Sequence, residues 1–261
     1  MSHIHSQEQI ALPVASSRIA ATLLPSGRMA HSCFKIPLNA DDNTTCNLCL
    51  SGPHAYLIQR ASLIIWDEAV MCSKHNFEAV DRSLQDIMGA LDPALDNVSF
   101  GGKVVVFSGD FRQLLPVVKK ETCSEVVADS IRSASFWNVV EVLRLTVNMQ
   151  VQNSDPAAAE FADTLLAIGD GRAPYTSQVQ IPPEWCLDTN DTMSLNNEIY
   201  PSIHNSDLEP HEYHNRAILA AKNIDVDIIN DTAFSLFPGT PHTYNSNDTI
   251  IDHDDPVLKQ H

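Results

Sequence analysis

The sequence predicts an α/β protein built around a parallel sheet, and two apolar runs carry most of that prediction. Residues 63–66 read Leu-Ile-Ile-Trp and lead directly into Asp67 and Glu68. Residues 104–107 read Val-Val-Val-Phe and lead into Ser, Gly and Asp. Continuous apolar runs of this length are typical of strands that are buried on both faces of a parallel sheet. Because such sheets bind ligands at the carboxyl ends of their strands, both polar ends should lie at one active-site rim.

Two short elements and a helix are predicted before the strand that ends at Asp67 and Glu68. Residues 10–17 predict a short buried strand. Residues 18–24 predict a short helix, because Pro25-Ser26-Gly27 is a strong stop signal. A helix over residues 53–60 should then lead into the strand at residues 62–66.

The next elements continue the alternation. Residues 77–90 carry apolar side chains at 77, 80, 84, 87 and 88, which is the stripe of an amphipathic helix. A loop over residues 92–99 should precede the strand at 103–107, and a helix around 125–140 should precede a short strand at 142–145. Strands that alternate with helices predict a doubly wound parallel sheet with right-handed crossovers.

The remaining part is less regular. Residues 155–168 predict a helix, and residues 172–212 are rich in loop-forming residues. A strand at 216–221 and a helix at 224–236 should follow. A single strand followed by a single helix cannot bury both faces of the strand, so this pair should be the start of a second sheet.

These patterns divide the chain into a first lobe over residues 1–151, a helical and loop-rich connection over 152–212, and the start of a second lobe over 213–261. The net charge of −17 is uneven. Residues 1–151 hold 12 Lys and Arg against 15 Asp and Glu, whereas residues 152–261 hold 4 against 18. Because acidic surfaces repel phosphates, only the first part should be able to approach a nucleic acid.

Location and redox state follow from simple counts. No apolar stretch approaches the roughly 20 residues that cross a bilayer, and residues 1–8 lack the pattern of a signal peptide. We therefore expect an intracellular protein without a membrane segment. The six cysteines are scattered, which favours reduced thiols. Cys46 and Cys49 form a single C-x-x-C pair, for which two ordinary thiols are favoured over a metal site.

Three motifs stand out in combination: W-D-E-A at 66–69, G-G-K-V-V-V-F at 101–107 and G-D-F-R-Q-L-L-P-V at 109–117. With them, the chain resembles the Pif-type (petite integration frequency) DNA helicases of superfamily one, and most of all the expanded and Helitron-like copies of eukaryotic genomes. Further matching stretches lie at 24–32, 34–37, 77–82, 145–149 and 217–230.

The resemblance implies two RecA-like lobes that clamp ATP, with Mg²⁺ as metal cofactor and single-stranded or forked DNA as partner, unwound in the 5′-to-3′ direction. Asp67 would hold Mg²⁺, Glu68 would be the general base and Gln113 would sense the γ-phosphate. Asp110 and Arg112 would shape the sensor loop. The implied catalytic residues are Asp67, Glu68, Arg112 and Gln113, and the implied nucleotide contacts are Asp67, Glu68, Gly109, Asp110 and Gln113. For Asp67 and Glu68 the simpler alternative is a pair of acidic residues that caps a helix or lies on the surface. For Arg112 and Gln113 it is a turn that these side chains stabilise before Pro116.

The resemblance also assigns the early motif to DNA. It implies contacts from Arg28, His31, Phe34 and Lys35, because rings can stack on any base while cations follow the phosphates. For His31 and Phe34, packing in the core is the alternative.

The sequence departs from the family pattern in four places. It contains no G-x-x-G-x-G-K-[ST] loop, whose N–H groups and Lys would cradle the phosphates. Gln150 stands where the family has Arg, and a neutral amide cannot supply the charge of an arginine finger. Arg18 replaces an expected Gly, and the sequence ends at His261 before the later motifs. We therefore expect a truncated family member whose first lobe lacks its phosphate-binding unit and which hydrolyses little ATP.

The function implied by resemblance is an ATP-dependent DNA helicase of DNA repair, recombination and telomere maintenance, located in the nucleus or, alternatively, in mitochondria. Two alternatives stay open. One is a catalytically dead module that binds DNA or protein, and the other is a sequence without function of its own, either a fragmentary gene copy or a gene model that missed upstream exons. The sequence indicates no oligomeric state.

Overall fold

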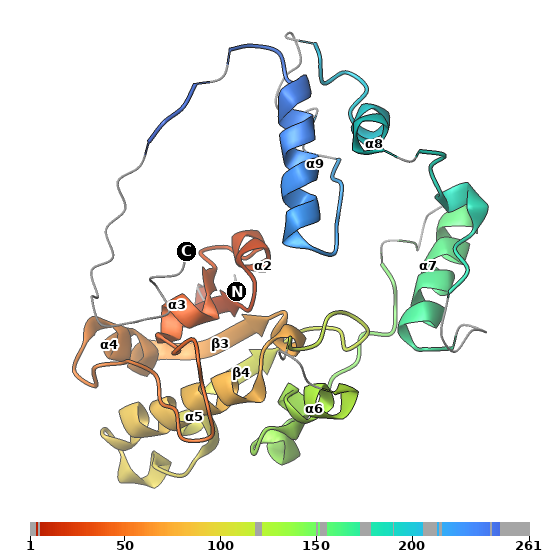
Figure 1. The fold of residues 1–261 in the computed structure, drawn as a ribbon. Coiled ribbons are helices and arrows are strands. Elements are labelled where there is room, and N and C mark those ends of the chain that lie inside the picture. The colour runs from red at the N-terminus through yellow and green to blue at the C-terminus, as the bar shows by residue number, and fades with distance from the viewer. Residues whose placement is uncertain are drawn as a thin grey trace. The chain divides into compact units, whose positions relative to one another are not determined.

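The computed structural model divides the chain into two compact units, Met1–Val179 and Gln180–His261 (Figure 1). It describes residues 4, 6–117, 122–149, 151, 156–172, 179–189, 191–205, 213, 216–240 and 242–245. The lobe boundaries expected at residues 151 and 212 stay predictions. None of the helices in this described part has the length and apolar character needed to cross a membrane.

The first unit contains a four-stranded parallel sheet in the order β2-β1-β3-β4. Its strands are β1 (Ile10–Ala15), β2 (Arg28–Met29), β3 (Ala61–Asp67) and β4 (Val104–Phe107). The α/β class, the parallel sheet and the three longer strands are confirmed. The strand β2 was not predicted, because two residues are too few to show a period.

In the described residues, helices connect the strands of the first unit, and the second unit contains further helices. The α-helices of the first unit are α2 (Arg18–Leu23), α3 (Ala30–Phe34), α4 (Pro53–Arg60), α5 (Lys74–Gly89), α6 (Cys123–Ala128) and α7 (Pro156–Gly169). Those of the second unit are α8 (Thr192–Ile199) and α9 (Asn223–Leu236). The helices expected at 18–24, 53–60, 77–90, 155–168 and 224–236 are therefore confirmed, with shifted ends. The longest helix of the described residues, α5, is capped by Ser73, whose side chain accepts from His75 N.

Trp66 lies at the centre of the core. Its fully buried ring has its centroid 5.7 Å from that of Phe34 in α3 and 4.5 Å from that of Phe77 in α5. The Phe107 ring at the end of β4 lies 6.3 Å from Trp66. The indole N–H donates to Ser16 Oγ over 3.0 Å. The residue before Asp67 is thus fixed from three neighbouring elements.

Two predictions after β4 are wrong. The helix expected around 125–140 is the short α6 followed by 3₁₀ turns at Ile131–Ser133 and Trp137–Val139. The hydroxyls of Ser130 and Ser133 both donate to Val127 O, and such local bonds compete with helical ones. The strand expected at 142–145 is not formed: Leu143 and Leu145 are 83% and 101% exposed, and no strand lies beside them in the described residues.

The second unit also differs from expectation. The strand expected at 216–221 is absent from the described residues, where Arg216 instead donates from Nη1 to Ile199 O over 2.7 Å. The helix α8 falls in a stretch expected to be loop. It begins at Asp191, whose side chain accepts from Ser194 N over 2.8 Å.

Candidate active site at the strand ends

The parallel register brings the polar strand ends together. Ala15 pairs with Asp67, and Trp66 pairs with Phe107, so Ser108 follows beside Asp67. Ser108 N donates to Trp66 O and Ala69 N donates to Ser108 O, both over 2.9 Å. The carboxyl ends of β3 and β4 therefore form one continuous rim, as the sequence predicted.

Asp67 is held by two donors on one carboxylate oxygen. Its Oδ1 accepts from Glu68 N over 3.0 Å and from Ser108 Oγ over 2.6 Å. The described residues give Oδ2 no hydrogen bond. Sequence reasoning did not assign Ser108 to the site, although a hydroxyl at the first position after a buried strand was the available signal.

Glu68 is unusual in both backbone and side chain. Its φ and ψ of 51° and 39° are left-handed, a region that residues other than glycine seldom occupy. Its Oε2 is buried and accepts no hydrogen bond from the described residues. A buried carboxylate oxygen without a donor is unfavourable for folding, so a ligand or a water would be its natural partner.

Gly109 is required by a close approach of two chain segments. A Cβ at this position would lie 3.1 Å from Val70 Cγ1 and 3.3 Å from the Val70 backbone N. A larger residue would therefore push the strand end away from the turn that follows Glu68.

The turn after Gly109 is stabilised by its own side chains. Asp110 Oδ1 accepts from Arg112 N over 3.0 Å, and Gln113 N donates to Asp110 O over 3.0 Å. Gln113 is exposed, and no hydrogen bond in the described residues joins it to Asp67 or Glu68. The roles expected for Asp110 and Gln113 thus stay predictions. Gln150, the residue expected in place of an arginine finger, lies outside the described residues.

Arg112 has a partner that was not anticipated. Its Nε donates to Asp170, at the turn that ends α7, and Asp170 also accepts from Arg172 Nη2 over 2.5 Å. These contacts raise the pKa of Arg112 and lower the pKa of Asp170. Since the ion pair is exposed, it contributes little to stability.

The early motif lies near the same rim. Arg28 and Lys35 are exposed, with Arg28 paired to Val14 at the end of β1. Burial lowers the pKa of His31. Phe34 is fully buried against Trp66, so its ring has no surface to offer a base. The expectation that Phe34 contacts DNA is therefore corrected, and the core-packing alternative describes it.

Hard oxygen ligands at this rim fit a magnesium ion better than a nucleotide. Asp67 Oδ2, Ser108 Oγ and Glu68 Oε2 are the types of donor that Mg²⁺ takes directly or through water. For ATP the fit is incomplete, because the sequence holds no G-x-x-G-x-G-K-[ST] loop.

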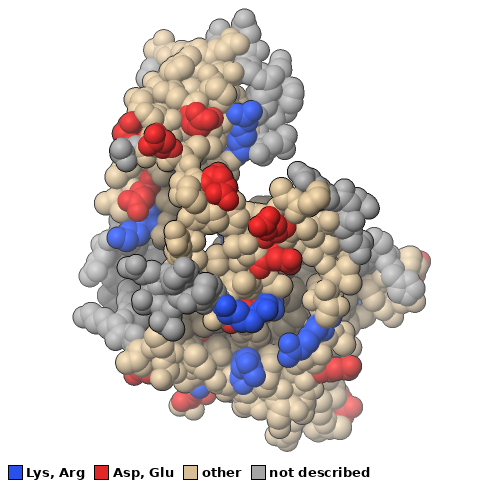
Figure 2. Space-filling view, turned by 90° about the vertical axis from the view of Figure 1, so that its right-hand side faces the viewer, with Lys and Arg blue, Asp and Glu red and all other residues tan. Residues whose placement is uncertain are grey.

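Charges are mixed on one face of the protein. On the face shown in Figure 2, Lys and Arg side chains lie in small separate groups, and Asp and Glu side chains are also present. On that face a polyanion would therefore meet local cations and not a continuous basic field.

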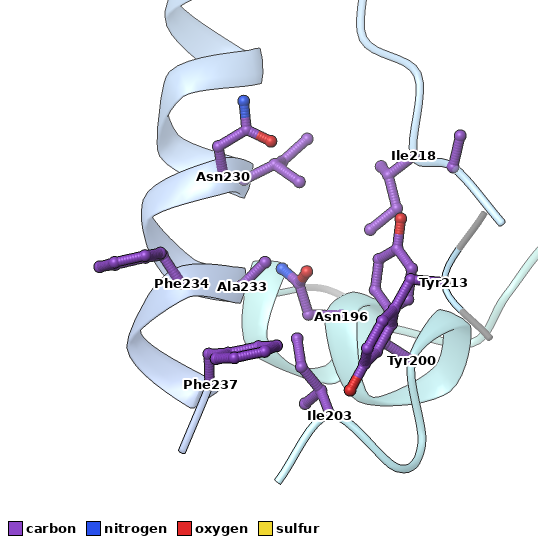
Figure 3. A pocket seen from close by; sticks show the side chains of 11 residues that line it. Asn196, Tyr200, Ile203, Tyr213, Ile218, Asn230, Ala233, Phe234 and Phe237 are labelled. Carbon is purple, nitrogen blue, oxygen red and sulfur yellow. The ribbon is translucent and has the colours of Figure 1, made fainter. Parts of the chain in front are cut away.

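The second unit contains a separate, uncharged pocket with a volume of about 510 Å³ between α8 and α9 (Figure 3). Asn196 is fully buried there, and its Oδ1 has no hydrogen-bond partner in the described residues. The pocket is lined by Asn196, Tyr200, Ile203, Tyr213, Ala217, Ile218, Ile229, Asn230, Ala233, Phe234 and Phe237. Its polar lining consists of Asn196, Asn230, Tyr200 and Tyr213, so the polar side chains that face it are neutral amides and phenols.

Two comparisons found proteins that are similar to this chain. A family model described as PIF1-like helicase matches residues 1–179. The Pif1 helicase from Bacteroides in complex with ADP-AlF3 and single-stranded DNA is similar with a TM-score of 0.59 and 21% identity, over 86% of this chain and 47% of that one. The Pif1 helicase from Candida albicans is similar with a TM-score of 0.57 and 19% identity, over 100% of this chain and 52% of that one. No curated protein matches the chain.

This chain thus spans about half the length of the solved helicases that it matches. At these identities the structural likeness shows the fold, a parallel α/β arrangement shared with RecA-like helicase lobes. The family model covers well over half of the sequence, including both strand ends of the rim. The chain belongs to the PIF1-like helicase family.

Proposed function

We propose that this chain carries part of the ATP-hydrolysing site of an ATP-dependent DNA helicase that acts on single-stranded or forked DNA. The observation that carries the proposal is the rim itself: Asp67 held by Ser108, with the buried and unpartnered Glu68 Oε2 beside it. A purely structural role would not require a glutamate with a left-handed backbone and an unpaired carboxylate oxygen. A general base in ATP hydrolysis, in contrast, must have an oxygen that is free to accept a proton.

The roles follow from these contacts. Asp67 would hold Mg²⁺ through Oδ2 while Ser108 and Glu68 N fix its other oxygen. Bound there, Mg²⁺ would neutralise charge that develops on the phosphates. Glu68 would take a proton from the attacking water at Oε2. Gln113, on the exposed turn after Gly109, would contact the γ-phosphate.

We further propose that this chain alone hydrolyses ATP negligibly. It holds no phosphate-cradling loop, and Gln150 stands in place of the finger, a loss that typically lowers the rate by about 10³–10⁵. We also propose, from the family resemblance, that the helicase acts in repair, recombination and telomere maintenance and is located in the nucleus or in mitochondria.

The test is a steady-state ATP hydrolysis assay on the full chain, with and without oligo-dT, beside the Glu68→Gln variant. We expect equal background rates. A DNA-stimulated turnover of about 1–100 s⁻¹, typical of phosphoryl-transfer enzymes, that Glu68→Gln abolishes would contradict the proposed inactivity.

A fusion to segments of the family type tests the site. With a family-type amino-terminal loop and a family-type carboxyl-terminal part added to this chain, Gln150→Arg should raise the rate of ATP hydrolysis by orders of magnitude, and Glu68→Gln should abolish hydrolysis. A restored fusion that hydrolyses ATP equally well with Gln at 68 would refute the assigned base.

A catalytically dead module that binds DNA is the second candidate. It is favoured by the exposed cations Arg28 and Lys35 near the rim, which need no hydrolysis to hold phosphates. Salt-sensitive binding of oligo-dT without any ATP hydrolysis would support it.

A further inference from the structure

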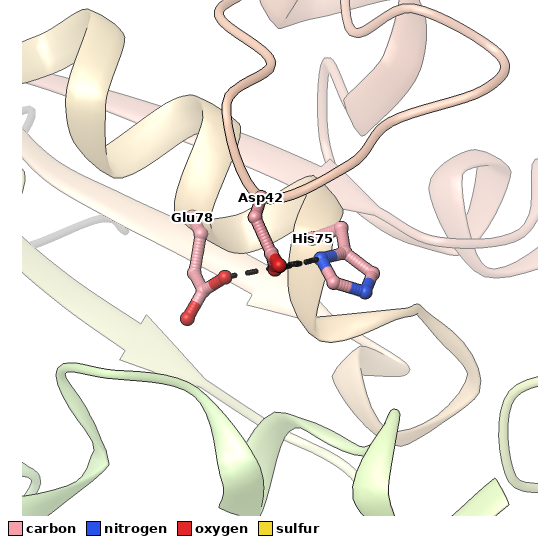
Figure 4. A group of neighbouring side chains, drawn as sticks. All are labelled: Asp42, His75 and Glu78. Atoms are coloured by element: carbon pink, nitrogen blue, oxygen red, sulfur yellow. Dashed lines mark ion pairs between the residues drawn. The ribbon is translucent and has the colours of Figure 1, made fainter. Parts of the chain in front are cut away.

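A second cluster of metal-ligand types lies at the start of α5. His75 is on the first turn of the helix, Glu78 follows one turn later, and Asp42 comes from the loop after α3 (Figure 4). His75 Nδ1 lies 3.1 Å from Asp42 Oδ1 and 4.0 Å from Glu78 Oε2. One ligand atom from each residue lies within 4.8 Å of the other two. Two ligands of one tetrahedral zinc ion lie roughly 3.3 Å apart, so small side-chain movements would close the set.

The buried Nδ1 has no hydrogen bond. Although Asp42 Oδ1 is only 3.1 Å away, the described residues provide no acceptor in line with an Nδ1–H group. A carboxylate that is close to Nδ1 but off its axis is the arrangement that two ligands of one metal adopt. A protonated imidazole would instead align its N–H with one oxygen.

The two ligands on α5 are each oriented by a neighbour. His75 Nε2 faces Asp129 Oδ1 at 3.6 Å, and Asp129 is itself fixed by Ser73 Oγ over 2.6 Å. Carboxylates in this position behind an imidazole are common in metal sites. Glu78 Oε1 accepts from Ser135 N over 2.8 Å, which leaves Oε2 toward the histidine.

The loop that carries Asp42 is held against α5 without a metal. Arg82 donates from Nη2 to Thr44 O over 2.6 Å, and Cys46 N donates to Ser83 Oγ over 2.8 Å. The third ligand is therefore brought to the helix by contacts that do not involve the cluster.

Charge favours a cation here. Asp42, Glu78 and Asp129 surround one imidazole, and among the described residues no Lys or Arg pairs with these three carboxylates. We propose that Asp42, His75 and Glu78 form a divalent metal site of the zinc class, separate from the rim at Asp67. One imidazole with two carboxylates suits Zn²⁺ better than Mg²⁺, which prefers oxygen ligands alone. A bound ion would tie the loop at 41–46 to the start of α5.

The test uses the full chain after a chelator has removed transition metals, in a buffer that contains excess Mg²⁺. Binding of Zn²⁺ is measured by calorimetry, and binding of Co²⁺ is measured by absorption spectroscopy. We expect one ion per chain, with a cobalt spectrum that lacks the thiolate charge-transfer band which Cys46 and Cys49 would produce. Free Zn²⁺ at about one hundred times its Kd should raise the Tm of the chain by about 5–10 °C.

Two matched pairs of variants locate the site. His75→Ala and Asp42→Asn should each weaken Zn²⁺ binding at least about tenfold and remove the rise in Tm. The controls His54→Ala and Asp86→Asn change exposed residues of α4 and α5 and should bind as the unmodified chain does. Since Asp42 is on an exposed loop, its variant should fold even where His75→Ala does not. No stoichiometric binding, binding unchanged in Asp42→Asn, or a thiolate band would each overturn the proposal.

Discussion

Glu68 combines two features that are unfavourable for folding. Its backbone is left-handed, and its buried Oε2 accepts no hydrogen bond from the described residues. Neighbouring contacts impose this geometry: Glu68 N donates to Asp67 Oδ1, and Ala69 N donates to Ser108 O. The surrounding strand ends therefore maintain a residue that would otherwise relax.

Replacing Glu68 with Gly should stabilise the protein. Gly adopts the left-handed region freely, while an L residue there costs about 1 kcal/mol. The matched comparison is Glu68→Ala, which also removes the carboxylate but keeps the backbone penalty. Urea denaturation should give the Gly variant a free energy of unfolding about 1 kcal/mol above that of the Ala variant. Equal values would mean that the backbone at 68 is not strained.

Sequence reasoning reached the acidic pair but not its environment. Asp67 and Glu68 follow a buried apolar run, so their place at a strand end was predictable. Ser108 was not assigned, because its importance depends on the register between two strands. Phe34 was assigned to DNA by motif position, yet a motif does not reveal on which side of a five-residue helix a ring lies.

The contact between α5 and the turn at Ser99–Gly102 depends on a buried carboxylate. Asp81 of α5 accepts from Phe100 N over 2.5 Å, and Phe100 has a left-handed φ of 54°. Burial raises the pKa of Asp81, in spite of the hydrogen bond from Phe100 and that from Gln85. The ionised form is therefore disfavoured in the folded chain relative to the unfolded one.

This shift has a definite sign. Where the folded pKa is the higher one, stability declines as pH rises from the unfolded pKa, about 3.9, through the folded pKa. Asp81→Asn keeps an acceptor for Phe100 but cannot ionise. Its stability relative to the unmodified chain should thus increase between about pH 3 and pH 7, as measured by urea denaturation. Asp86→Asn, on the exposed side of α5, controls for the loss of one charge. A difference that does not change with pH would contradict the assignment.

The strand β4 lies at the edge of the sheet. Among the described residues it pairs only with β3, and Val104 and Val106 are 60% and 47% exposed. The apolar stretch at 142–145 has strand-forming residues, yet it does not pair with this free edge and forms no strand. Backbone pairing decides whether such a stretch becomes a strand, and local sequence does not contain that information.

An apolar edge strand of this kind should promote association. We expect Val106→Lys to lower the concentration-dependent light scattering of the chain, because an edge lysine disfavours strand addition. Val139→Lys, at a position that is 69% exposed in a 3₁₀ turn outside the sheet, is the control. If both variants scatter alike, association does not proceed through β4.

At the scale of the whole molecule, the two units differ in net charge. Residues 1–179 hold 13 Lys and Arg against 19 Asp and Glu, a net −6, and residues 180–261 hold 3 against 14, a net −11. The proposed DNA contacts Arg28 and Lys35 lie in the first unit, while the second adds only repulsion for a polyanion. The sequence predicted this asymmetry of charge, while the lobe boundary expected at residue 151 stays a prediction. Within the first unit, the Arg112–Asp170 contact joins the turn after α7 to the turn after β4.

A chain that ends at Val179 should therefore bind single-stranded DNA more tightly than the full chain at low salt. Removing a net −11 relieves repulsion and leaves the proposed contacts in place, and the difference should shrink as salt screens the charges. Fluorescence anisotropy of labelled oligo-dT at two salt concentrations measures both effects. In the shortened chain, Arg28→Ala should weaken binding, whereas Arg60→Ala, at the opposite end of the strands, should not. A shortened chain that is folded by circular dichroism yet binds more weakly than the full chain would show that the acidic unit contributes contacts of its own.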